Sequence, residues 1–173
     1  MVWPVVNGKE TFTRFREGED PYVEAGSGVQ FYGNADKRAV VWIRPYEPAP
    51  EVPDATYPFW LCTGRVLEHW HSGTITRRVK QLYLAYPHAT ANLHPKDAAR
   101  LGLKNGDKIR ITSRRGSVLV HADVGGRVTP QESMVYVPWF DEDVMINRVT
   151  LEAFCPISGQ NDFKKCAVRI EKA

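Results

Sequence analysis

The chain has 173 residues, of which 23 are basic and 20 are acidic, so its formal net charge is +3. This length is enough for one domain with a substantial core. The charge is nearly balanced and its signs are interspersed, which argues against a nucleic-acid-binding or membrane-surface protein, and no apolar run approaches membrane-spanning length.

The start of the chain has no basic region followed by an apolar one, so it does not resemble an export signal. We therefore expect either a protein that stays where it is made or a piece of a longer one. The cysteines are odd in number, form no C-x-x-C motif and lie in apolar contexts, which predicts buried free thiols. They are Cys62, Cys155 and Cys166.

Residues 1–56 read as an irregular, turn-rich lead-in that ends in a proline-rich linker. Short hairpins are expected around Asn7-Gly8 and Asn34-Ala-Asp36, and one strand over Ala39–Ile43. Aromatic side chains recur here without a repeating pattern. We expect them to pack onto a missing neighbour or to cover the rest of the chain.

Residues 57–173 are predicted to form the main domain, which opens with a buried strand at Tyr57–Cys62. A mixed helix or irregular segment follows at 77–85, and a short strand at 90–93. The stretch His94–Gly102 predicts a short helix, because Pro95 suits a first helical position and Gly102 suits a C-cap.

Further strands are predicted from alternating or short apolar runs at 108–113, 117–124, 134–138 and 166–170. Arg114-Arg-Gly116 joins the first two as a hairpin turn. Six or seven short strands with little helix indicate a small β-barrel rather than a βαβ sheet.

The stretch Thr63–Thr76 holds more hydrogen-bonding groups than a core needs. Arg65 offers a planar fork of donors for phosphate or carboxylate, and Trp70 offers a stacking face. Ser72, with the glycine and threonine after it, would let backbone amides approach phosphate oxygens. These groups suit a nucleotide-like ligand. A plainer reading is a polar loop that caps a helix near Thr76.

Several phrases of the sequence resemble one known family. They are Tyr57-Pro-Phe-Trp-Leu-Cys-Thr-Gly-Arg-Val-Leu-Glu-His-Trp-His-Ser-Gly-Thr-Ile-Thr-Arg-Arg78, His94-Pro-Lys-Asp-Ala98, Leu101–Asp107, Ser113–Gly116, Val137–Asp141, Ile146–Leu151 and Asp162-Phe-Lys-Lys-Cys-Ala-Val168. The whole chain resembles the C-terminal region of the catalytic subunit of periplasmic nitrate reductases, within the molybdopterin oxidoreductase family. The phrases around Glu68–Ser72 and Asp162–Cys166 are the ones specific to the nitrate reductase branch.

This resemblance implies a double-psi β-barrel of the aspartate-decarboxylase-like kind that covers a molybdenum bis(molybdopterin guanine dinucleotide) cofactor. Trp139 matches an aromatic residue beside the substrate funnel. We expect Arg65, Trp70, Asn147 and Lys164 to line one shared concavity. The residues that match cofactor contacts are Thr63, Gly64, Arg65, Val66, Leu67, Glu68, His69, Trp70, His71, Ser72, Asn147 and Lys164.

The family's cysteine motif for a [4Fe–4S] cluster and its cysteine ligand to molybdenum have no match in this sequence. The chain alone is therefore expected to be inactive. By resemblance, the full enzyme reduces nitrate to nitrite in the periplasm, in nitrate assimilation and electron transport. Its partners would be the remaining domains of the catalytic subunit and a c-type cytochrome electron donor.

Two other functions remain open from the residues. A stand-alone double-psi barrel of the self-cleaving decarboxylase type would need a Gly-Ser bond, which Gly116-Ser117 and Gly26-Ser27 both supply. A non-catalytic assembly subunit would need none of this chemistry. His69 and His71 form His-x-His, which binds zinc only if two further ligands converge on it.

Overall fold

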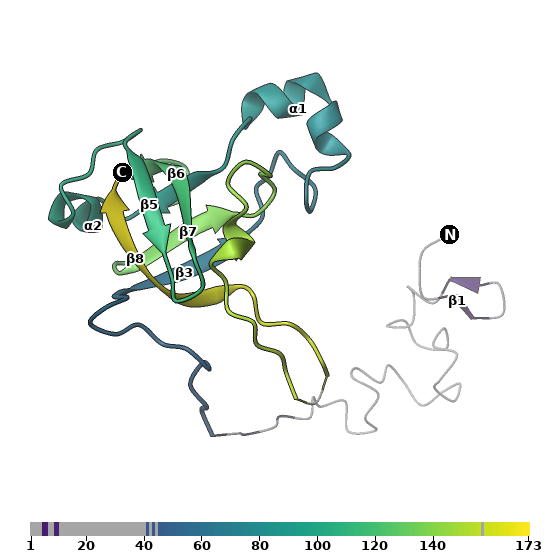
Figure 1. The fold of residues 1–173 in the computed structure, drawn as a ribbon. Helices are drawn as coiled ribbons and strands as arrows, with labels where there is room; N and C mark the ends of the chain where they lie inside the picture. The colour runs from purple at the N-terminus through teal and green to yellow at the C-terminus, as the bar shows by residue number, and fades with distance from the viewer. Residues whose placement is uncertain (1–4, 7–8, 11–40, 42, 44, 157) are drawn as a thin grey trace. The chain divides into compact units, whose positions relative to one another are not determined.

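The computed structural model describes residues 5–6, 9–10, 41, 43, 45–156 and 158–173 (Figure 1). The chain divides into two compact units, Met1–Glu47 and Pro48–Ala173. In the first, β1 (Val5–Val6) pairs antiparallel with β2 (Lys9–Glu10), in agreement with the hairpin predicted around Asn7-Gly8. The hairpin predicted at 34–36 lies outside the described residues, and the boundary proposed at residue 56 stays a prediction.

The strand predicted over Ala39–Ile43 is wrong at the two of its residues that the structure describes. Val41 and Ile43 belong to no strand, and 79% and 95% of their surfaces are exposed. A strand is stable only when a neighbour pairs with its backbone and covers one face. An apolar, β-branched run therefore does not make a strand by itself.

The second unit is a closed six-stranded barrel in the order β3-β7-β4-β6-β5-β8 (Figure 1). The strands are β3 (Phe59–Gly64), β4 (Thr90–Leu93), β5 (Lys108–Thr112), β6 (Ser117–Val124), β7 (Met134–Pro138) and β8 (Lys165–Lys172). Its two parallel pairs are β3–β7 and β4–β6. This architecture confirms the predicted mainly β, double-psi β-barrel fold.

Alternation along the strands builds the barrel core. Ile109 and Ile111 on β5 point inward while their neighbours face solvent, and β6 repeats the pattern with Val118 and Val120. The first apolar run also alternates, since Phe59 is buried and Trp60 is only half-buried. Burying one face of each strand inside the closed sheet supplies the main stabilising term.

The strand pairing brings three chain segments to one end of the barrel. Gly64 ends β3 opposite Pro138 at the end of β7, because these two strands are parallel. Lys165 begins β8 opposite Cys62, because β8 runs antiparallel to β3. The connections that leave β3 and β7, and the segment that enters β8, therefore meet at the same place.

Short helices lie in the connections. In α2 (Pro95–Arg100), Pro95 begins the helix, and the His94 side chain accepts a hydrogen bond from the backbone N–H of Lys96, as its cap. The segment predicted as mixed becomes η2 (Thr76–Arg78) and α1 (Lys80–Ala85), neither of which buries a residue. Figure 1 shows α1 standing away from the barrel. Within the described residues, every helix is too short or too polar to cross a bilayer.

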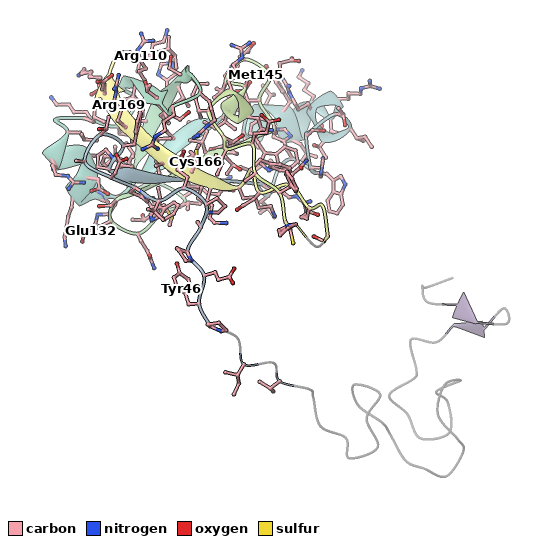
Figure 2. All side chains as sticks on the ribbon, turned by 60° about the horizontal axis from the view of Figure 1, so that its bottom comes forward. Tyr46, Arg110, Glu132, Met145, Cys166 and Arg169 are labelled. Atoms are coloured by element: carbon pink, nitrogen blue, oxygen red, sulfur yellow. The ribbon has the colours of Figure 1, made fainter. Side chains whose placement is uncertain are left out.

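Cys62 and Cys166 are free thiols, as predicted. Cys166 is fully buried on β8, where its Sγ donates to the carbonyl of Val149 at 3.3 Å (Figure 2). Burial raises the pKa of this thiol to about 11, so it stays neutral at physiological pH. Cys62 and Cys155 are only half-buried, which corrects the expectation that all of the thiols are buried.

A half-buried ion pair between Glu51 and Arg115 holds residues 48–56 against the barrel. Both carboxylate oxygens of Glu51 accept hydrogen bonds from the Arg115 guanidinium, at 2.7 and 2.8 Å. One of them also accepts from the backbone N–H of Ala167 on β8 at 2.8 Å. The hydrogen bond from Arg115 is the main reason that the pKa of Glu51 lies below its ordinary value of 4.5.

We expect Glu51→Ala to lower the free energy of unfolding by about 1.5–3 kcal/mol, because it leaves Arg115 without its carboxylate. The pKa of Glu51 is lowered in the folded state, so its contribution is present above pH 4.5 and is lost as the pH falls. Urea titrations at several pH values measure the free energy of unfolding. It should fall less on acidification in Glu51→Ala than in the parent protein. Glu47→Ala, at an exposed position, is the control and should match the parent protein.

Candidate functional site

The exit of β3 is held against β7 by a close backbone approach. A Cβ on Gly64 would lie 2.6 Å from the Tyr136 hydroxyl oxygen, so only glycine fits beside this ring. The same hydroxyl donates to the carbonyl of Arg65, and the backbone N–H of Trp139 donates to the carbonyl of Gly64 at 3.3 Å. The two exits therefore start from fixed positions.

His69 lies inside the loop that follows β3 and is only 2% exposed. Its Nε2 donates to the carbonyl of Tyr86 at 2.8 Å, because a carbonyl can only accept. Its Nδ1 therefore accepts from the Thr76 hydroxyl at 3.2 Å, and the oxygen of that hydroxyl accepts from the backbone N–H of Trp70 at 3.1 Å. Both ring nitrogens are engaged, which leaves neither for the zinc ligation that His-x-His allowed.

Glu68 also points inward, with 8% of its surface exposed. One carboxylate oxygen pairs with Arg127 from the connection between β6 and β7, and the other is buried without a hydrogen-bond partner. Burial raises the pKa of Glu68, but the hydrogen bond and charge of Arg127 outweigh it and lower the pKa overall. The Arg127 guanidinium carbon also lies 5.7 Å from the centre of the Tyr86 ring.

Several other side chains of the loop face solvent. Trp70 is 71% exposed, and the Arg65 guanidinium carbon lies 5.9 Å from its ring centre. The His71 ring meets the edge of Trp139 at 4.5 Å between ring centres. Leu67 is 94% exposed, and Val66 and Ser72 are half-buried. This exposed face combines aromatic surface with a positive charge.

Lys164 lies beside the same loop. Its carbonyl accepts the backbone N–H of Thr63 at 2.9 Å, while its own side chain is exposed. Within the described part of the chain, neither Lys164 nor Arg65 forms an ion pair with a carboxylate. Arg65 beside an exposed indole, with Lys164 next to the strand that leads into the loop, suits the phosphates and planar ring of a dinucleotide.

Asn147 lies in η3 (Ile146–Arg148) and lines a separate pocket of about 690 Å³. None of Arg65, Trp70 and Lys164 lines that pocket, so it is not the shared concavity that the sequence led us to expect. Phe163 connects the two places, because it lines the pocket and its carbonyl accepts the Thr63 hydroxyl at 3.2 Å. The pocket is lined by Arg115, Asn147, Thr150, Leu151, Glu152, Ala153, Phe154, Asn161 and Phe163.

The structure thus divides the residues predicted to contact a cofactor. Thr63, Glu68 and His69 are buried and bonded to protein atoms, whereas Arg65, Trp70 and the other exposed members are free to meet a ligand. A cofactor contact by any of them stays a prediction. Sequence reasoning missed three of the residues that hold the loop, because they are distant in the chain and carry no motif; they are Tyr86, Arg127 and Tyr136.

Gly116-Ser117, the bond that the self-cleaving hypothesis singled out, lies at the turn between β5 and β6. The Gly116 carbonyl accepts an ordinary hydrogen bond from the backbone N–H of Ser113 at 2.9 Å. Ser117 pairs with Thr112 in the antiparallel register of the hairpin. The other Gly-Ser pair, at 26–27, lies outside the described residues.

Gly64→Ala should destabilise the barrel by about 1–3 kcal/mol, because the new methyl group meets the Tyr136 ring. Chemical denaturation of the single variants and of the double variant with Tyr136→Ala would measure this. The loss caused by Gly64→Ala should be smaller in the Tyr136→Ala background. Equal losses in both backgrounds would contradict the close contact.

His69→Ala should lower the free energy of unfolding by about 2–4 kcal/mol, because it opens a cavity and strands the Tyr86 carbonyl. His71→Ala changes an exposed ring and should alter it by no more than about 0.5 kcal/mol. Guanidinium titrations of the two variants test the division of the loop. Similar losses in both would show that the division is wrong.

Comparison with known proteins extends these observations. The family model described as "Molydopterin dinucleotide binding domain" matches residues 59–167. Acetylene hydratase from Pelobacter acetylenicus has a similar structure, with a TM-score of 0.55 and 20% identity over 68% of this chain. The chain spans only 18% of that enzyme's length, and at this identity the likeness is one of fold. The computationally designed msDPBB_sym2 protein aligns with a TM-score of 0.36 and 15% identity, over 66% of this chain and 96% of its own. Because the family model covers more than half of the sequence, this chain belongs to the molybdopterin dinucleotide binding domain family.

Proposed function

We propose that this chain is the C-terminal domain of a periplasmic nitrate reductase and that it covers a molybdenum bis(molybdopterin guanine dinucleotide) cofactor. The observation that carries the proposal is the exposed pair of Arg65 and Trp70, which lies beside Lys164 at one end of the barrel. A dinucleotide needs stacking surface and cations together, and this end of the barrel offers both.

The exposed residues have distinct roles in this proposal. Arg65 presents a planar fork of donors to phosphate oxygens, and Lys164 adds a mobile point charge. Trp70 provides a face for a ring system. Asn147 offers an amide to ring edges from the neighbouring pocket, and Trp139, held against His71, borders the path of the substrate.

The buried residues position this surface. His69 and Glu68 anchor the loop from inside, through Tyr86 and Arg127. Because the loop is fixed from within, Arg65 and Trp70 are presented with little freedom left to lose on binding. This preorganisation supports a binding function over that of a non-catalytic assembly subunit.

Two phrases of the sequence favour the nitrate reductase branch over other molybdopterin enzymes. They are Glu68-His-Trp-His-Ser72 and Asp162-Phe-Lys-Lys-Cys166. The hydrogen bond between the N–H of Thr63 and the carbonyl of Lys164 places the second phrase beside the end of β3, from which the loop with the first phrase departs. Both phrases therefore belong to the same end of the barrel, which is compatible with one ligand for both.

In the full enzyme, the molybdenum centre supplies the redox chemistry when it is bound. Nitrate takes up two electrons and two protons to give nitrite and water, with a c-type cytochrome as the electron donor in the periplasm. The remaining domains of the catalytic subunit provide the metal ligand and the [4Fe–4S] cluster. The chain of 173 residues is therefore proposed to be inactive alone.

We expect Arg65→Ala and Lys164→Ala, each introduced into the full-length enzyme, to weaken cofactor retention. Loss of a charge-assisted hydrogen bond to phosphate should weaken binding by about 1.5–3 kcal/mol. The measurement is the molybdenum and guanine nucleotide content of the purified enzyme after dilution and gel filtration.

Arg110→Ala and Lys108→Ala are matched controls, because both residues are exposed on β5, away from the exits of β3 and β7. They should leave the cofactor content unchanged. Unaltered retention in both Arg65→Ala and Lys164→Ala would contradict cofactor binding at this end of the barrel. Absence of nitrate reduction by the loaded parent enzyme would contradict the assignment of the substrate.

A further inference from the structure

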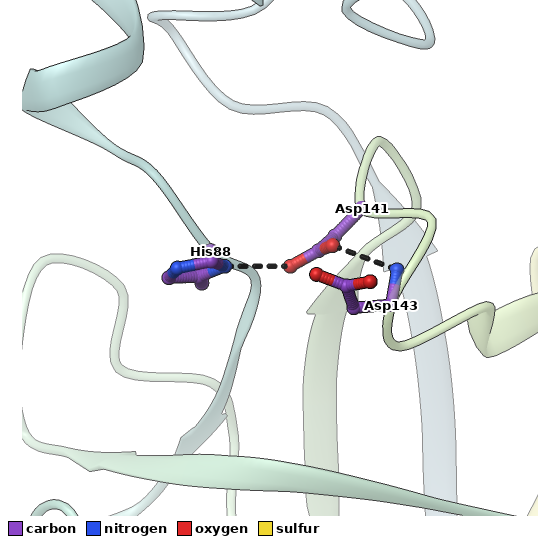
Figure 3. A group of neighbouring side chains, drawn as sticks. All are labelled: His88, Asp141 and Asp143. Carbon is purple, nitrogen blue, oxygen red and sulfur yellow. Dashed lines mark hydrogen bonds and ion pairs between the residues drawn. The ribbon is translucent and has the colours of Figure 1, made fainter.

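We propose that His88, Asp141 and Asp143 form a binding site for a divalent transition metal of the zinc type. One ligand atom from each side chain lies within 4.8 Å of the other two. Figure 3 shows the imidazole and both carboxylates converging on one space. An imidazole nitrogen with two carboxylate oxygens is a ligand set that suits Zn²⁺.

The barrel topology creates this convergence. The start of β4 lies beside the end of β7, because the two strands are antiparallel and Asn92 pairs with Tyr136. His88 therefore approaches β4 where Asp141 and Asp143 leave β7. His88 lies 53 positions before Asp141 (141 − 88), so the chain carries no local motif that holds all of the ligands.

Asp141 is a fixed ligand. Its side chain is only 1% exposed, and its two oxygens accept the backbone N–H groups of Ala89 at 2.7 Å and Asp143 at 3.0 Å. Each oxygen keeps a further lone pair. Backbone donors that orient a carboxylate in this way are typical of the groups that support metal ligands.

The charge of the cluster favours a cation. In the region that the structure describes, no lysine or arginine pairs with Asp141 or Asp143, whereas the neighbouring Glu142 pairs with Arg77 at 3.4 Å. The hydrogen bonds from backbone N–H groups are enough to explain why the Asp141 carboxylate is buried. It does not explain why the Asp143 carboxylate and the His88 ring also face this oxygen.

The distances allow a metal after a small movement. His88 Nδ1 lies 3.7 Å from the nearer Asp141 oxygen. Bonds of about 2.0–2.2 Å place tetrahedral ligand atoms about 3.3–3.5 Å apart. The side chains that must move are those of His88, which is 63% exposed, and of exposed Asp143. Three protein ligands would leave a fourth position for water.

The test is calorimetric titration of the 173-residue chain with ZnCl₂, supported by the visible absorption of a Co²⁺ complex. We expect one metal ion per chain. Asp143→Asn and His88→Gln should each raise the Kd at least about tenfold. Both positions are exposed, so the melting temperatures of the metal-free variants should equal that of the parent protein.

Glu142→Gln and His121→Gln are matched controls. The first removes a carboxylate next to the site, and the second removes an imidazole away from it. They should leave the Kd unchanged. His71→Gln tests the rival His-x-His site and should also leave it unchanged. The proposal is overturned if zinc does not bind, if either cluster variant binds it as the parent does, or if His71→Gln abolishes binding.

Discussion

The parallel pairing of β3 with β7 is the constraint on which the rest of this domain depends. It requires both strands to end at the same place, with Gly64 opposite Pro138. The Tyr136 side chain lies against the Gly64 backbone there, so a Cβ at Gly64 would meet the ring and its hydroxyl. Two long connections start from this clamp, and they carry the exposed aromatic and basic residues as well as the His88–Asp143 cluster. The contact at Gly64 therefore helps to fix where the connections that carry these side chains begin.

The connection after β3 must keep a fixed conformation and also present side chains to a ligand. A polar loop without regular structure must satisfy its backbone while it presents side chains outward. His69 and Glu68 bond inward to Tyr86 and Arg127, and these contacts hold the loop in place. Arg65 and Trp70 are exposed and can contact a ligand. Two consecutive buried residues therefore hold the loop, while the exposed residues on either side of them face outward.

Most of the barrel could be predicted from the sequence because its strands alternate, as β5 and β6 do, and because Pro95 and Gly102 punctuate α2. The strand expected over Ala39–Ile43 is wrong at the described residues Val41 and Ile43, because a local pattern says nothing about whether a partner strand exists. The candidate site was predicted in part: the motif located the loop, but not which of its side chains point inward. The contacts of Arg127 with Glu68, and of His88 with Asp141, join residues more than 50 positions apart and left no local signal.

The division of the loop also changes how its motif should be understood. Both ring nitrogens of His69 are engaged within the domain itself, by the Tyr86 carbonyl and the Thr76 hydroxyl. Its place in the phrase Glu-His-Trp-His therefore reflects a requirement of the fold: an imidazole is needed to bridge two backbone segments. Trp70 and His71, which directly follow the buried pair Glu68 and His69 and are exposed, experience no such requirement from the domain itself. A substitution that preserves the fold but changes the ligand should therefore occur at the exposed positions first. The buried positions are informative about the fold of the loop, not about the ligand that it binds.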